Sequence, residues 1–466
     1  MPGGHRLLRL GPDRPLGRPD ALHPAALRAA RRPHAARRLG RRRGAPDVSA
    51  IRPGAALAVW LRIGCTSFGG PVAQIDLLHR EVVERRGWLD ERSFLHALRL
   101  CNALPGPEAQ QLACWLGWRV GGLRGALTAG GLFILPGLVL ILALAWLYAS
   151  LGETAWMTGA VRALGGAVIA LVLAAGLRMG RRVVRTRWVL ALGVGAGAAM
   201  LLGAPFPVVV VAGAALGVLL GRVRPAALVP LEDQVDPGAP LDPAERRRVV
   251  RRALVGGALW LGGLGALLLV GGVIAELAGL FTVAALVTFG GAYAVLPFVA
   301  AAAVDRFGWL TPEQMVAGLA LGETTPGPLI LVNAFVGFMA GWAALGGAAG
   351  GIAGGLVATA ATFAPSFLLI GVGAPLVERV PQRGPVADAL AALQGVVAGA
   401  IAVLAVFLVG TALLPTGSID LLAAAVAVAV FALRHLGLPV PALLAATALI
   451  GALVGVLDPG LLLVAR

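Results

Sequence analysis

The 466-residue chain has no lysine, and charged residues make up only 13% of it, against 58% hydrophobic residues. So few charges exclude a water-soluble multidomain protein. The mean hydropathy of +0.85 and recurring apolar runs of about 20 residues indicate helices that cross a lipid bilayer. Because these runs are continuously apolar rather than alternating, a β-barrel is not expected. The sequence predicts an all-α polytopic membrane protein.

The chain also has only three cysteines and lacks a nucleotide-binding motif. Cys65, Cys101 and Cys114 lie in or beside apolar segments at spacings that match no zinc or redox pattern, so we expect them to pack as small apolar residues. No metal site and no cofactor are predicted. The phosphate-loop pattern G-x-x-x-x-G-K-[ST] is absent, which excludes an ATP-driven pump. Energy would then come from an ion gradient or from the substrate's own gradient.

Positive charge is concentrated ahead of the first apolar run. The formal net charge is +16, and residues 1–48 alone contain 12 Arg against three Asp. We expect residues 1–50 to be a disordered basic tail or a spuriously translated extension; alternatively, they form a cytoplasmic tail that orients the chain or binds lipid. Because 12 Arg against three Asp put about nine of the sixteen net positive charges in this one tail, no nucleic-acid partner is predicted.

One series of motifs occurs twice in the chain. Phe68-Gly69-Gly70, Gly87-Trp88-Leu89 and Pro105-Gly106-Pro107 return 221 residues later as Phe289-Gly290-Gly291, Gly308-Trp309-Leu310 and Pro326-Gly327-Pro328. This fixed offset indicates a tandem duplication. Membrane proteins with helices interrupted at matching positions of two duplicated halves are typically secondary transporters, because the interruptions free backbone dipoles to face a substrate.

The apolar runs predict thirteen spans in two sets of six with one unduplicated span between them. We assign residues 51–221 to the first repeat, 222–280 to a charged linker with the extra span, and 281–466 to the second repeat. The expected spans are 54–77, 94–118, 124–150, 158–178, 188–203, 205–221, 253–274, 281–303, 313–340, 345–373, 386–413, 419–433 and 438–464.

The distribution of arginine predicts the orientation of these spans. Short cytoplasmic loops are enriched in basic residues, and a cytoplasmic N-terminus places the Arg-rich segments 178–187 and 222–252 in the cytoplasm. One loop, residues 79–92, has four Arg on the outer side, offset there by four acidic residues. Six spans and one extra span turn the second repeat upside down, so we expect two inverted repeats in the plasma membrane.

The first interruption in each repeat is a pair of glycines. Paired Gly followed by Pro71 is expected to unwind the helix at membrane depth, which is tolerated only where protein or a water-filled cavity surrounds the backbone. The N–H groups that begin the next half-helix make a natural anion seat. Arg62 lies two turns before Gly69 and is a candidate anion ligand. Alternatively, Arg62 snorkels or pairs with Asp76 or Glu108.

The second interruption is the Pro-Gly-Pro segment, which polar residues flank. Glu323 occupies the position of Asn102 in the duplication, and a carboxylate at bilayer depth holds a proton more readily than one in water. Each of these polar groups could instead form hydrogen bonds between helices. The candidate substrate-binding residues are Arg62, Ser67, Phe68, Gly69, Gly70, Pro71, Asn102, Pro105, Gly106, Pro107, Gly290, Gly291, Thr324, Thr325, Pro326, Gly327 and Pro328, and the candidate proton-coupling residues are Glu323 and Glu108.

These motifs resemble the chromate ion transporter (CHR) family of the long-chain, two-domain type. In the first repeat the resemblance rests on residues 66–71, on Glu84-Arg85 with Trp88-Leu89, and on residues 104–107. In the second it rests on residues 288–297, 323–330 and 335–338. It covers about residues 52–465 and leaves out the basic tail.

The resemblance implies a transporter, not an enzyme, that exports chromate from the cytoplasm and confers chromate resistance. Its expected drive is the membrane potential or a proton gradient, with proton antiport through Glu108 or Glu323 as one form. Chromate is a tetrahedral dianion close to sulfate in shape, so a seat of N–H groups and one Arg suits both ions. Sulfate or another oxyanion as substrate, a passive anion channel and a homodimer remain open. A chromate reductase would need a cofactor motif or a thiol pair.

Overall fold

The computed structural model describes residues 53–151, 154–183, 186–224, 228, 242–379, 384–415 and 418–457. These residues belong to one compact unit, are mostly helical and contain no strand. The basic tail, residues 1–50, lies outside the described residues, as do most of the linker 222–242 and the last residues of the chain. The prediction of an all-α polytopic membrane protein is confirmed.

The first repeat begins with a short interrupted hairpin and continues into long helices. Its elements are α2 (Pro53–Thr66), α3 (Gly70–His79), the π-helix η2 (Arg80–Arg85), α4 (Glu91–Ala103), α5 (Glu108–Leu151), α6 (Ala155–Val183), α7 (Arg187–Leu201) and α8 (Phe206–Val223). Within α5 the backbone leaves helical geometry at Gly121 and Gly122, so this element is two helices joined at a kink. The helix α9 (Pro243–Val270) follows.

The second repeat has the same order of elements. They are α10 (Gly272–Val287), η4 (Ala292–Ala294), α11 (Leu296–Ala301), the π-helix η5 (Ala302–Arg306), α12 (Pro312–Thr324), η6 (Leu329–Leu331), α13 (Val332–Leu345), α14 (Gly347–Gly373), η7 (Ala374–Arg379), α15 (Pro385–Leu408), η8 (Val409–Leu413), α16 (Leu421–His435) and α17 (Val440–Leu457). Both copies even carry a π-helix before the Gly-Trp-Leu motif. The duplication read from the sequence is thus also a duplication of structure.

Seven of the described helices are long and apolar enough to cross a membrane, and five shorter apolar helices accompany them. The shorter ones include α2 and α10, which end where the glycine pairs interrupt the predicted spans. An interrupted span appears as two short helices because paired Gly, followed by Pro71 in the first repeat, interrupts the helical hydrogen bonds of the backbone. The interruptions lie where the motifs predict them, but α9 ends at Val270 and α10 begins at Gly272, so the predicted span 253–274 runs across the boundary between these two helices.

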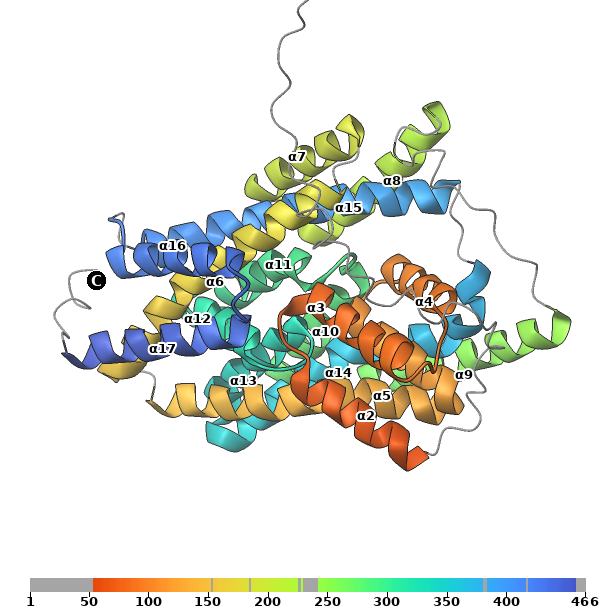
Figure 1. Ribbon diagram of the computed structural model, residues 1–466, viewed down its shortest axis with the longest axis horizontal. Coiled ribbons are helices and arrows are strands. Elements are labelled where there is room, and N and C mark those ends of the chain that lie inside the picture. Colours follow the sequence, from red (N-terminus) through yellow and green to blue (C-terminus); the bar gives the residue numbers. More distant parts are fainter. Residues whose placement is uncertain are drawn as a thin grey trace, which may run out of the picture. The chain divides into compact units, whose positions relative to one another are not determined.

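The two copies exchange their last helices. Helix α6 of the first repeat packs against α16 and α17 of the second, and α15 of the second packs against α7 and α8 of the first (Figure 1). Close backbone contact makes this packing tight: a Cβ added to Gly193 of α7 would lie 2.8 Å from the carbonyl oxygen of Gly395 in α15. Neither repeat has a complete core of its own, so the two copies form one structure.

One buried ion pair also joins the copies. Arg162 of α6 donates from Nε at 2.9 Å and from Nη2 at 2.7 Å to Asp420, which caps the N-terminus of α16. The Asp420 side chain is only 3% exposed. In the first repeat, Thr186 caps the equivalent helix α7. The N-cap residue of α16 is thus charged and contacts the other copy, whereas the N-cap residue of the equivalent helix α7 is uncharged.

Candidate functional site

Each repeat leaves helical geometry first at its glycine pair. Helix α2 ends at Thr66 and α3 begins at Gly70, while α10 ends at Val287 and η4 begins at Ala292. Gly69 and Gly70 have φ of 90° and 78°, and their counterparts Gly290 and Gly291 have φ of 67° and 114°. Only glycine adopts such angles readily. The predicted unwinding at both glycine pairs is confirmed.

The Pro-Gly-Pro segments break the next helices in the same way. Helix α4 ends at Ala103 and α5 begins at Glu108; helix α12 ends at Thr324 and η6 begins at Leu329. The central Gly106 and Gly327 have φ of 123° and 94°. The flanking prolines supply no N–H, so helical hydrogen bonding cannot continue through either segment. Each repeat therefore contributes two non-helical segments.

These four segments meet through a reciprocal pair of backbone hydrogen bonds. The N–H of Gly106 donates to the carbonyl of Thr288 at 2.7 Å, and the N–H of Gly327 donates to the carbonyl of Ser67 at 2.8 Å. Each glycine thus bonds to the segment of the other repeat, at equivalent positions. We call residues 66–70, 104–107, 288–291 and 325–328 together the crossing. A pseudo-two-fold axis between the two copies would relate these two hydrogen bonds to each other.

Buried side-chain amides of the first repeat support the crossing. The Gln74 amide nitrogen donates to the carbonyl of Gly327 at 2.6 Å and lies 3.4 Å from that of Ser67. The Gln111 amide donates to the carbonyl of Pro105 at 2.7 Å. Both glutamines are at most 1% exposed. They satisfy carbonyls that the broken helices leave unpaired, as a non-aqueous interior requires.

Some buried polar atoms near the crossing have no partner. Among the described residues, the Ser67 hydroxyl and the Oε1 atoms of Gln110 and Gln111 lack a hydrogen bond. The first turn of α3 also has no side-chain cap, since Gly69 stands at the N-cap position. Unpaired buried groups of this kind are uncommon in proteins and often accompany function.

The second repeat brings both predicted carboxylates to its glycine pair. Glu323, near the end of α12, is 6% exposed and accepts a hydrogen bond from the Tyr293 hydroxyl of η4. Glu108 of the first repeat approaches Gly291, where a Cβ would lie 3.9 Å from its Oε1. The Gln394 amide of α15 lies 3.2 Å from a Cβ placed on Gly290. Three helices therefore present polar side chains to one break.

The arginine that the sequence singles out does not form the expected ion pairs. Arg62 lies exposed on α2, and its backbone carbonyl accepts a hydrogen bond from the Thr66 hydroxyl at 2.8 Å. Its side chain pairs with neither Asp76 nor Glu108; Asp76 instead pairs with Arg80 at 3.0 Å.

The remaining predicted residues differ in exposure. Asn102 is exposed near the end of α4, whereas its counterpart Glu323 is buried. The Thr324 and Thr325 hydroxyls donate to carbonyls of their own helix, at 2.7 Å to Leu321 and 3.0 Å to Gly322. Buried members of the predicted set are Ser67, Gly70, Gly106, Pro107, Gly291, Thr325, Pro326, Gly327 and Pro328, and half-buried members are Phe68, Gly69, Pro71, Pro105, Gly290, Thr324 and Glu108.

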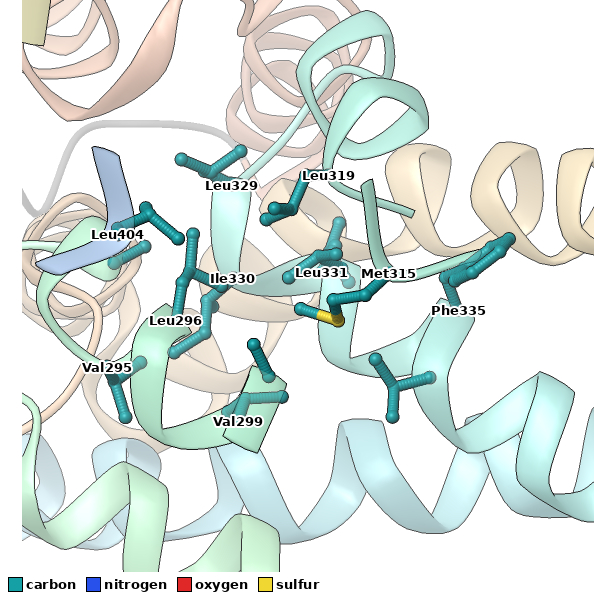
Figure 2. Packing of buried hydrophobic residues seen from close by; sticks show 14 of the residues in the cluster. Val295, Leu296, Val299, Met315, Leu319, Leu329, Ile330, Leu331, Phe335 and Leu404 are labelled. Atoms are coloured by element: carbon teal, nitrogen blue, oxygen red, sulfur yellow. The ribbon is translucent and has the colours of Figure 1, made fainter. Parts of the chain in front are cut away.

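An apolar cluster lies directly after the breaks of the second repeat. Its side chains pack against one another (Figure 2), and the segment after Gly291 and the segment after Pro328 contact α12 and α15. The residues seen there include Val295, Leu296, Val299, Met315, Leu319, Leu329, Ile330, Leu331, Phe335 and Leu404. The second repeat therefore has a close-packed apolar cluster directly after its breaks.

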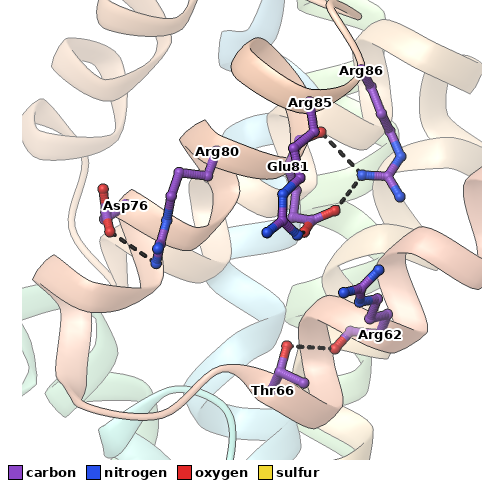
Figure 3. A network of polar contacts seen from close by, with 7 residues as sticks. All are labelled: Arg62, Thr66, Asp76, Arg80, Glu81, Arg85 and Arg86. Atoms are coloured by element: carbon purple, nitrogen blue, oxygen red, sulfur yellow. Dashed lines mark hydrogen bonds and ion pairs between the residues drawn. The ribbon is translucent and has the colours of Figure 1, made fainter. Parts of the chain in front are cut away.

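A separate charged network lies on η2 of the first repeat, outside the predicted spans. Glu81 is 2% exposed and accepts hydrogen bonds from Arg85 and Arg86 (Figure 3). Burial raises the pKa of the Glu81 carboxyl, but the bonds and charges of the two arginines outweigh burial and hold the pKa below its ordinary value. The second repeat has Ala302 at the equivalent position.

Two of the residues at the second break were not predicted from the sequence. Tyr293 is one of two tyrosines in the chain, and its counterpart in the first repeat is Val72, a difference that could have been noticed. Gln394 lies on a helix far along the chain, so no local pattern connects it to the break. Among the described residues, no group of three or more His, Cys, Asp or Glu side chains is placed to hold a metal ion.

Comparison with known proteins gives a family for this architecture. The chain matches the family described as "Chromate transporter" over residues 55–218 and 275–455. It is 28% identical over 354 residues to a protein of Synechococcus elongatus named "Probable chromate transport protein", covering 74% of this chain and 82% of the relative. No solved structure matches the chain.

Two further relatives have similar names. A "Chromate transport protein" of Pseudomonas aeruginosa is 35% identical over 288 residues, which cover 61% of this chain and 66% of the relative. Another, from Cupriavidus metallidurans, is 27% identical over 345 residues, which cover 73% of this chain and 78% of the relative. The two matched segments coincide with the two structural repeats and together span well over half of the sequence. The chain belongs to the chromate transporter family.

Proposed function

We propose that this chain is a secondary transporter that moves chromate, or a sulfate-like oxyanion, through the crossing. The observation that supports this most is the reciprocal bonding of the four non-helical segments, from Gly106 to Thr288 and from Gly327 to Ser67. In transporters built from two repeats, substrates bind at the repeat interface beside the ends of broken helices. The names of the relatives supply the identity of the ion.

The oxyanion would be held by backbone N–H groups and by positive charge. The half-helix that starts at Gly70 directs its N-terminal dipole toward the crossing, and Gly69 provides no side chain to block it. The predicted segments 67–71, 105–107, 290–291 and 324–328 contribute this backbone. Exposed Arg62 and Asn102 would meet the ion on its way to or from the crossing. A tetrahedral dianion suits such N–H groups well.

The drive would be the membrane potential or a proton gradient. An inside-negative potential favours expelling a dianion by roughly 2.3 kcal/mol per charge per 100 mV. Glu323 and Glu108, which both reach the second break, are the groups we assign to proton coupling. In this proposal the two repeats are inverted, the N-terminus is cytoplasmic and the chain lies in the plasma membrane. Transport then exports chromate from the cytoplasm, and this export confers chromate resistance.

Two other functions use the same geometry. Sulfate has the charge and shape of chromate, so the crossing could serve sulfate with chromate as an incidental substrate. A passive anion channel would need a continuous wet path, and the apolar cluster around Leu296 and Leu329 argues for a closed, gated state. No cofactor and no enzymatic step enter this proposal, and a homodimer is compatible with it.

Transport by the purified full-length chain tests the proposal. Proteoliposomes are loaded with chromate, and efflux is followed with an imposed potential, with a pH gradient, with both and with neither. We expect accumulation against the chromate gradient, competition by sulfate, and strong loss in Arg62→Ala and Glu323→Gln. Wild-type protein that only equilibrates chromate would be a channel, and protein that moves no oxyanion would contradict the proposal.

Survival of a chromate-sensitive host tests the physiological part. A host that expresses this chain should tolerate more chromate than a host with the empty vector, and the chain lacking residues 1–48 should protect equally well. Equal sensitivity with and without the expressed, membrane-inserted chain would overturn export as the direction of transport.

A further inference from the structure

An open apolar groove lies between α7 and α8 of the first repeat. Its volume is about 680 Å³, its lining residues are all apolar, and Val396 of α15 also lines it. Helices α7 and α8 each contact α15 more extensively than they contact each other, which leaves space between them (Figure 1). Val208, Leu216 and Val223 line the groove and are each more than half exposed. An open apolar surface of this size in a membrane protein indicates a site for an apolar ligand.

Two arginines lie at one end of this groove, over the ring of Trp188. The guanidinium carbon of Arg187 in α7 lies 5.4 Å from the ring centroid, and that of Arg224 at the end of α8 lies 4.9 Å from it. Trp188 lines the groove and is half-buried, whereas both arginines are exposed. Asp388 of α15 lies beside Gly221, but within the part of the chain that the structure describes neither arginine pairs with a carboxylate.

We propose that the groove and its two arginines form a binding site for an anionic phospholipid. One acyl chain lies in the groove between α7 and α8, and the headgroup phosphate binds Arg187 and Arg224. The ligand is thus a diacyl glycerophospholipid with a net negative charge. This inference goes beyond the proposed function and does not require that the chain transports chromate.

The charges at the end of the groove favour a lipid phosphate. Stacking on an indole ring holds a guanidinium in place while its in-plane N–H donors stay free, and these donors match the oxygens of a phosphate. Tryptophan is itself enriched where helices meet the headgroup region of a bilayer. Because two positive charges already lie over the Trp188 ring, a choline ammonium would be repelled there. The site should therefore prefer an anionic headgroup to a zwitterionic one.

The length of the groove favours an acyl chain over a helix of a partner protein. The lining runs from Trp188 to Ala199 on α7 and from Val208 to Val223 on α8, which is about 16 Å and about 22 Å at about 1.5 Å per residue. The hydrocarbon core of a bilayer is about 30 Å thick, and one leaflet takes up about half of it. A partner helix that crosses the whole core would extend beyond the groove, whereas the acyl chain of one leaflet fits within it.

Native mass spectrometry of the full-length chain tests the headgroup contacts. Protein stripped of lipid in detergent is titrated with dioleoyl phosphatidylglycerol or with dioleoyl phosphatidylcholine, and the fraction with bound lipid is measured. We expect wild type to bind the anionic lipid about tenfold or more tightly. Arg187→Gln and Arg224→Gln should each weaken phosphatidylglycerol binding about fivefold. Arg252→Gln, which removes an exposed arginine of α9, is the matched control and should bind like wild type.

A variant that fills the groove tests the acyl-chain contact separately. Gly195 lines the groove, and a Cβ placed on it meets nothing within 4 Å, so Gly195→Leu adds a side chain without a clash at Cβ. This variant should bind both lipids about fivefold or more weakly and keep the preference for phosphatidylglycerol. Gly262→Leu, at an equally open position on α9, is the control and should bind both lipids like wild type.

Four results would overturn the inference. The first two are equal affinity for the two lipids and wild-type affinity in both arginine variants. The third is displacement of phosphatidylglycerol by inorganic phosphate, which would assign the arginines to a free anion. The fourth is Gly195→Leu that turns a dimer into a monomer and binds lipid like wild type, which would assign the groove to a second copy of the chain.

Discussion

The two repeats share one backbone at the crossing and differ in the side chains around it. After the breaks, the first repeat has Gln74, Glu108, Gln110 and Gln111, where the second has Val295, Leu329, Leu331 and Val332. The glycines and prolines of both copies adopt equivalent conformations. Duplication therefore preserved the conformation-setting residues, while the polar residues that determine chemistry diverged.

At two other positions the difference is reversed. The second repeat has Tyr293 and Glu323, where the first has Val72 and Asn102. Glu108 of the first repeat reaches Gly291, so polar groups of both copies gather at the second break. The apolar counterparts pack into the dry cluster of Figure 2. The two copies thus share a nearly symmetric backbone, but polar side chains gather at the second break while their apolar counterparts pack in the hydrophobic cluster.

Removal of the ion pair between copies should have the largest effect on stability. Arg162→Ala leaves the buried Asp420 without its cation, and breaking a buried pair costs about 3–5 kcal/mol. Thermal denaturation in detergent, followed by size-exclusion chromatography, should show a large loss. Adding Asp420→Thr, which copies the Thr186 cap of the first repeat, should restore part of it. Arg222→Ala, an exposed charge on α8, serves as the control.

Alanine at the crossing glycines should be the next most damaging change. Gly106→Ala and Gly327→Ala force a side chain into positive φ, a strain of about 1–3 kcal/mol. Gly106→Ala should cost more, because its Cβ lies 2.7 Å from the Gln111 amide that bonds to Pro105. The same denaturation assay applies, with Gly195→Ala in open space on α7 as the control. Equal tolerance of alanine at all three positions would contradict the described crossing.

Replacing Gln74 tests whether the crossing needs the hydrogen bonds that buried glutamines of the first repeat donate to it. Gln74→Val introduces the residue of the second repeat and leaves the Gly327 carbonyl without this donor. An unsatisfied buried acceptor costs about 1–3 kcal/mol. Hydrogen exchange should then increase at residues 325–328 as well as around residue 74. Thr128→Val, on an exposed hydroxyl bonded to its own helix, should change nothing measurable.

Acidification should slightly destabilise residues 79–92 of the first repeat and have less effect on the equivalent residues 300–313 of the second. The pKa of Glu81 is lowered in the folded protein, so its stabilising contribution is complete above its unfolded pKa and is lost as pH falls through the folded value. Limited proteolysis between pH 6 and pH 3 should show earlier cleavage in residues 79–92 than in 300–313, which has Ala302 instead. Glu81→Gln should reduce the difference between the two pH values, and the lowered pKa of Asp90, which accepts a hydrogen bond from the Ser93 N–H, accounts for the remainder.

The repeated motifs predicted the broken helices because glycine pairs and Pro-Gly-Pro act locally on the backbone. They did not predict the reciprocal bonds, which join residues far apart in the chain. Arg62 was placed near Gly69 by helical spacing, but α2 ends at Thr66, so that helical face does not continue to the glycine.

Proton-linked chromate transport by Glu323→Asn tests the central claim most directly. This change gives the second repeat the residue that the first repeat has at the same position, so the scaffold becomes more symmetric. In proteoliposomes, over a pH range in which chromate stays a dianion, we expect the variant to lose the pH dependence of chromate transport and most of the rate, while wild type keeps both. A folded Glu323→Asn protein with wild-type rate and pH dependence would contradict the assignment of the site to the second break.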